Sequence, residues 1–135
     1  MALLLARKAD ENAGSCRYDQ TTSTYTIAGV GVDIWDTIDE LHFAYKTLNG
    51  DGCITAQIDS VENVHEWTKA GVMIRNTLDA TSENAMVLVT PIGRMAFQYR
   101  HAKAATTYST YIPVGTVQLP HWVRLTRTRP DSTQI

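Results

Sequence analysis

The stretch Lys69-Ala70-Gly71-Val72-Met73-Ile74-Arg75 decides the fold of this chain. In an extended chain Ala70, Val72 and Ile74 point to one side, and the other four residues point to the opposite side. An apolar row packs on a core, whereas the opposite row can face water. The stretch therefore predicts a strand whose second face is either an ordinary solvated sheet face or the floor of a binding groove.

Further short alternating segments surround this strand. We expect strands at residues 23–28, 41–48, 53–61, 85–90, 94–100, 108–114 and 121–127. The 85–90 segment is apolar on both faces, which is typical of a central strand, and Pro113 limits the 108–114 segment to a sheet edge. Seven or eight short strands without a long helix predict an all-β, antiparallel two-sheet β-sandwich.

The sequence also predicts one tight turn and the residues of the core. Asn49-Gly50-Asp51-Gly52 joins two alternating segments, and glycine and asparagine accept the positive φ of tight turns. We therefore expect a β-hairpin formed by residues 41–48 and 53–61. The alternation predicts six core residues, together with at least one of Phe43 and Tyr45. The six are Val72, Ile74, Val87, Val89, Val123 and Leu125.

The bulk composition limits the class of protein. The chain has 135 residues, which suits one domain, and a net charge of −2, which does not attract nucleic acid or an acidic membrane. No apolar run reaches the length of a transmembrane helix. We expect residues 1–17 to be a loose leader and residues 18–127 the folded domain, followed by a divergent tail at 128–135. Cys16 and Cys53 are interpreted as free thiols, although a disulfide between them is the alternative.

Few residues carry recognisable chemistry. The four histidines are scattered, and no expected strand holds two glutamates at a spacing suited to glycoside hydrolysis. Asp33, Asp36 and Asp39 are interpreted as turn-forming aspartates. Their alternative role is a calcium site, because carboxylates and loop carbonyls are the ligands of calcium. We expect no other cofactor.

An ordered set of motifs is similar to those of a known family. They are Gly31-Val32-Asp33-Ile34-Trp35, Asp39-Glu40-Leu41-His42-Phe43, Gly50-Asp51-Gly52, the Lys69–Arg75 stretch and Trp122-Val123-Arg124-Leu125. Over roughly residues 18–127 the chain resembles the concanavalin A-like jelly rolls of a family of unknown function, also called regulation-of-enolase-like domains.

The resemblance implies a two-sheet jelly roll of the lectin and glucanase type. It also implies a module of secreted bacterial proteins, hence an extracellular or cell-surface location, and it supplies no catalytic residues. Family members continue past the Trp-Val-Arg-Leu strand with closing strands, whereas residues 128–135 diverge here. We therefore expect a C-terminal truncation that leaves an open sheet edge, and a homodimer formed through that edge.

The expected function is non-catalytic carbohydrate binding on the concave face of the jelly roll. The residues expected to line that face are Lys69, Arg75, Gln98, Arg100, Trp122 and Arg124. A hydrolase acting on glycans is the first alternative, and it requires a pair of carboxylates brought together by the fold. A structural or interaction domain without a small-molecule ligand is the second, with an exposed edge that pairs with another chain.

Overall fold

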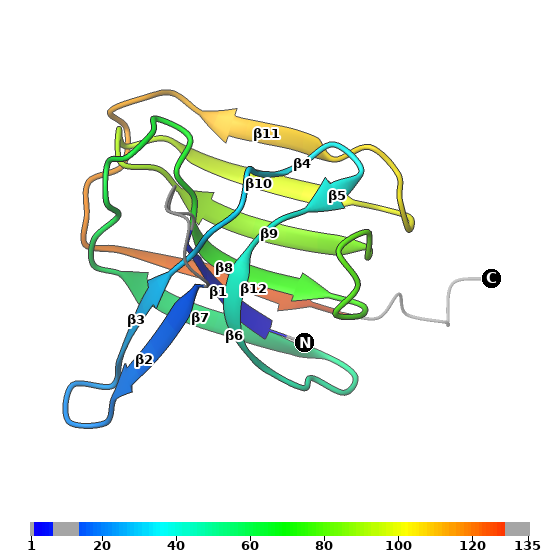
Figure 1. The fold of residues 1–135 in the computed structure, drawn as a ribbon, viewed down its shortest axis with the longest axis horizontal. Helices are drawn as coiled ribbons and strands as arrows, with labels where there is room; N and C mark the ends of the chain where they lie inside the picture. The colour runs from blue at the N-terminus through cyan, green and yellow to red at the C-terminus, as the bar shows by residue number, and fades with distance from the viewer. Residues whose placement is uncertain (1, 7–13, 129–135) are drawn as a thin grey trace.

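The computed structural model describes residues 2–6 and 14–128, and in these ranges the protein is all-β, with antiparallel sheets and no helix (Figure 1). The strands are β1 (Ala2–Ala6), β2 (Ser15–Asp19), β3 (Thr24–Ala28), β4 (Ile34–Trp35), β5 (Ile38–Asp39), β6 (His42–Lys46), β7 (Gly52–Ile58), β8 (Ala70–Arg75), β9 (Asn84–Val89), β10 (Met95–Arg100), β11 (Tyr108–Ile112) and β12 (His121–Arg127).

The main layer is a six-stranded sheet in the order β11-β10-β9-β8-β1-β6. The strand predicted from Lys69–Arg75 forms β8, in the interior of this sheet, where every one of its residues is buried. Strand β9 lies between β8 and β10, which confirms the central position predicted from its apolar faces. The predicted edge strand is confirmed as β11.

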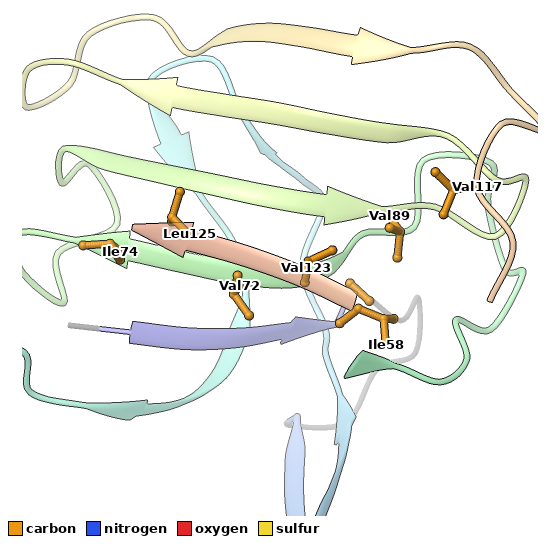
Figure 2. Packing of buried hydrophobic residues seen from close by; sticks show 8 residues of the cluster. Ile58, Val72, Ile74, Val89, Val117, Val123 and Leu125 are labelled. Carbon is orange, nitrogen blue, oxygen red and sulfur yellow. The ribbon is translucent and has the colours of Figure 1, made fainter. Parts of the chain in front are cut away.

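A second layer of two strands, β7 and β12, packs over β8 and β9 on one face of the main sheet. Figure 2 shows the side chains of the two layers meeting, with Val72 and Ile74 from β8 facing Val123 and Leu125 from β12. These four predicted core residues are buried, as is Val89. Among the remaining predicted residues, Val87 is half-buried against this core and Phe43 packs half-buried on the opposite face, whereas Tyr45 is exposed.

The opposite face of the main sheet carries a smaller apolar cluster. It consists of Ile34, Met73, Met86, Leu88 and Ala96, with Leu41 and Phe43 packed against it. Ile34 belongs to the short β4–β5 segment, which lies across β9 and β10 in Figure 1. The face that could have been solvated is therefore covered by a loop.

Gly71 in β8 is required by a close approach of the neighbouring strand. A Cβ atom at this position would lie 2.1 Å from the carbonyl oxygen of Val87 and 2.7 Å from the Cα atom of Leu88, both in the backbone of β9. Backbone atoms cannot move aside as a flexible side chain can. The glycine in the Lys69–Arg75 stretch therefore permits the β8–β9 pairing.

The predicted hairpin of residues 41–48 and 53–61 is wrong. Strand β6 pairs with β1, and β7 pairs with β12, so the turn around Gly50 joins two different sheets. The cause is the apolar row of β7, which packs against the main sheet from the second layer. Because both of these strands have other partners, the turn sequence alone could not fix the pairing.

The expected loose leader also requires correction. Within residues 1–17, Ala2–Ala6 forms β1 between β8 and β6, and β2 begins at Ser15 and pairs with β3. The β2–β3 hairpin packs against β6 and projects from the body of the protein (Figure 1). Most of the expected divergent tail, residues 129–135, lies outside the described residues. Cys16 and Cys53 are both free and exposed, as preferred from the sequence.

The core assignment predicts the effect of shortening Ile74. Ile74→Ala should lower the free energy of unfolding by about 2–5 kcal/mol, because a cavity remains between the two layers. Ile38→Ala is the matched control, since Ile38 is 52% exposed and should change stability by no more than about 0.5 kcal/mol. Urea titration followed by circular dichroism measures both. Equal effects of the two substitutions would contradict the assignment.

Candidate functional site

The six residues expected to share one open concave face occupy two separate places, so this expectation is wrong. Lys69, Arg75, Gln98 and Arg100 are buried on the loop-covered face of the main sheet. Trp122 and Arg124 are exposed on the outer side of β12, in the second layer. The segment from Gly31 to Leu41 folds over three of these side chains, Lys69, Arg75 and Arg100.

Asp39 is the centre of the buried polar cluster. Its Oδ1 atom lies 2.7 Å from Nη2 of Arg100, and its Oδ2 atom lies 3.4 Å from Nη1 of Arg75. Nη1 of Arg100 and Nδ2 of Asn84 also donate to Oδ2, at 3.0 and 3.1 Å. One carboxylate therefore ties the β4–β5 segment to strands β8, β9 and β10.

The two arginines have further acceptors in the surrounding loops. Arg100 donates to the carbonyl oxygens of Asp36 and Ala105, at 3.2 and 3.0 Å, and Arg75 donates to those of Thr77 and Asp79. Burial lowers the pKa of Arg75, and the Asp39 carboxylate opposes this effect. An arginine remains charged at any ordinary pH, so the cluster is a hydrogen-bonded ion network.

Lys69 anchors the other end of the same segment. Its Nζ atom lies 2.7 Å from the Asp33 carboxylate and donates to the carbonyl oxygen of Ile34 at 2.7 Å. The Trp35 ring lies 5.7 Å from the same ammonium group and is 41% exposed. Asp33 also accepts a hydrogen bond from the backbone N–H of Ile34.

Two of the three aspartates considered for calcium pair with protein cations through their carboxylates. Asp33 pairs with Lys69, and Asp39 pairs with both buried arginines. The interactions of Asp36 run through its backbone carbonyl oxygen. Within residues 2–6 and 14–128, no group of three or more histidine, cysteine, aspartate or glutamate side chains is placed to hold a metal ion.

A cleft of about 920 Å³ provides the main open site. Residues from both faces of β7 line the cleft. The cleft therefore follows the edge of β7 that pairs with no described strand. Strands β3 and β6 form the opposite wall. Three exposed aromatic side chains contribute to the lining: Tyr25 (47% exposed), Tyr45 (54%) and Trp122 (64%). Trp122 is the one residue from the expected binding set that lines this cleft.

Polar side chains accompany the aromatic ones in the cleft. They are Lys46, Thr55, Gln57, Asp59 and Glu62, together with the buried Thr68. The Thr68 Oγ1 atom is buried and has no hydrogen-bond partner among the described residues. Sequence analysis missed Tyr25 and Tyr45 as site residues, because their position in the cleft depends on how the β2–β3 hairpin packs against β6, and no local pattern encodes that packing.

The two carboxylates in the cleft differ from those of a glycosidase. Asp59 and Glu62 are both exposed. A glycoside hydrolase needs one carboxyl group that is kept protonated, commonly by an apolar environment, while the other stays ionised. Both carboxyl groups of the cleft are instead exposed to solvent.

Comparisons with known proteins give no family for this chain, so its function is inferred from the geometry of the site. No family model, curated protein or solved structure matches this chain. In the described part of the chain, no helix is long and apolar enough to cross a membrane.

The ion network predicts a large effect of a small change at Asp39. Asp39→Asn should lower the free energy of unfolding by about 3–5 kcal/mol, because two arginines remain buried without a counter-charge. Asp36→Asn is the matched control in the same loop, because it retains the backbone carbonyl that accepts the hydrogen bonds. Its effect should stay within about 0.5 kcal/mol. Chemical denaturation measures the free energy of unfolding of both variants. An Asp39→Asn protein as stable as the unsubstituted one would contradict the role of Asp39.

Proposed function

We propose that this protein is a non-catalytic carbohydrate-binding module, and that the cleft along β7 holds the glycan. The observation that carries the proposal is the lining of this cleft, where Tyr25, Tyr45 and Trp122 stand beside hydrogen-bonding side chains. Sugars combine apolar C–H faces with hydroxyl groups. A mixed aromatic and polar wall matches both.

The size of the cleft and one unsatisfied hydroxyl group support a small saccharide. Ligand pockets in proteins measure about 300–1,000 Å³, and this cleft falls in that range. Buried polar atoms without a partner are uncommon in proteins, and the Thr68 hydroxyl at the cleft is one of them. A sugar hydroxyl that reaches this group would supply the missing hydrogen bond.

The proposed fold type is a concanavalin A-like jelly roll, and the motif resemblance described above is its support. The same resemblance is the basis for proposing an extracellular or cell-surface bacterial module. The all-β architecture and the packing of β7 and β12 on the main sheet are compatible with this proposal.

Trp122 provides the test of glycan binding. A glycan array should identify a retained saccharide, and titration calorimetry with that saccharide should show about tenfold weaker binding, or ~1.4 kcal/mol, for Trp122→Ala. Val32→Ala is the control, because Val32 is 69% exposed, comparable with Trp122, and lies outside the cleft. An array without any retained glycan, or unchanged affinity in Trp122→Ala, would reject the proposal.

We also propose that two copies of the chain associate through an open edge. Strand β12 pairs only with β7 among the described strands. Beside it, strands β10 and β11 expose Phe97, Tyr99 and Tyr108 on the face that the second layer leaves uncovered. The Tyr99 and Tyr108 rings lie 5.4 Å apart. A second copy would cover these rings and extend the sheet at the same time.

Solution mass tests this association. One chain weighs 15.0 kDa, so light scattering should give about twice that mass at micromolar concentration. Phe97→Lys should restore the single-chain mass, because it places a charge in the proposed interface, whereas Leu78→Lys on the exposed 76–79 turn should not. A mass near 15.0 kDa for the unsubstituted protein would reject the dimer.

A further inference from the structure

Arg94 forms a separate polar feature, outside both the ion network and the cleft. It precedes β10 and, by alternation with Met95, belongs to the loop-covered face of the main sheet. Its guanidinium carbon lies 3.9 Å from the centre of the Trp67 ring and 5.8 Å from that of Tyr111. The two rings are 6.4 Å apart and nearly perpendicular. Arg94 is thus held between two aromatic walls.

The guanidinium of Arg94 lacks the acceptors that satisfy its neighbours. Its Nε and Nη1 atoms are buried and have no hydrogen-bond partner within residues 2–6 and 14–128. On the same face, Arg75 and Arg100 each reach a carboxylate and several carbonyl oxygens. Arg94 as a whole is half-buried. Removing two of its three guanidinium nitrogens from water without an acceptor is unfavourable, and stacking on an aromatic ring recovers only part of the lost hydration. An added anion would recover the remainder.

We propose that Arg94, Trp67 and Tyr111 form a second binding site, which takes the carboxylate of an acidic sugar. The planar guanidinium matches a carboxylate, because two N–H groups can donate to its two oxygens in parallel. The aromatic walls suit the apolar face of the sugar ring. Tyr111 is 60% exposed, so much of its side chain remains open to a ligand. This assignment rests on the proposed function only for the class of ligand, because the site lies apart from the cleft.

The test uses sodium galacturonate as the charged probe, with neutral galactose and inorganic phosphate as comparisons. Titration calorimetry at fixed ionic strength should show saturable binding of galacturonate, and binding at least tenfold weaker for phosphate and galactose. Arg94→Lys keeps the charge but loses the planar fork, and it should weaken galacturonate binding at least tenfold. Arg17→Lys, a change at an exposed arginine on β2, should leave the affinity unchanged.

Two further variants distinguish this site from the cleft. Tyr111→Ala removes an exposed wall with little risk to folding, and it should also weaken galacturonate binding. Trp122→Ala should leave galacturonate binding intact, so failure of the cleft proposal can be recognised independently. Absence of saturable binding, equal affinity of Arg94→Lys and the unsubstituted protein, or phosphate binding as tight as galacturonate would overturn the assignment to an acidic sugar.

Discussion

The burial of Arg75 and Arg100 on one face of the main sheet constrains the rest of the structure. Strands β8 and β10 place both guanidinium groups on this face, at the level where Asn84 begins the intervening strand β9. Charges removed from water must be paired and hydrogen-bonded. Asp39 supplies the counter-charge, and it can do so only if the segment from Gly31 to Leu41 crosses the sheet. The covered face is thus a consequence of electrostatics as well as of apolar packing.

The two faces of the main sheet consequently differ in the surfaces that they leave open. One face is closed over β8 and β9 by the segment that carries Asp39. The other is covered by two strands, β7 and β12, which leave the rings on β10 and β11 exposed. The cleft, the exposed aromatic row and the Arg94 site all lie where a covering layer ends. Binding is therefore proposed at the margins of the layers rather than at the centre of a concave sheet.

Local alternation was sufficient to predict much of the fold, because each strand has one row that must be buried. Val72, Ile74, Val123 and Leu125 were assigned to the core in this way and are buried there. The same pattern could not show that Lys69 and Arg75 are buried, since a cation at an alternating position faces either water or a distant carboxylate. Nor could it pair β6 with β1, because that pairing joins residues 42–46 to the first residues of the chain. The cleft required the packing of β3 against β6, which is also a long-range contact.

Amide hydrogen exchange at Asp39 tests the central claim most directly. The Asp39 N–H donates to the carbonyl oxygen of Ala80 at 2.8 Å, and this bond exists only while the segment lies closed on the sheet. If the buried arginines hold the segment in place, this amide should exchange as slowly as those of β8, since both would open only with the fold as a whole. Exchange of the Asp39 amide near the rate of an unstructured chain, with β8 still protected, would contradict the account.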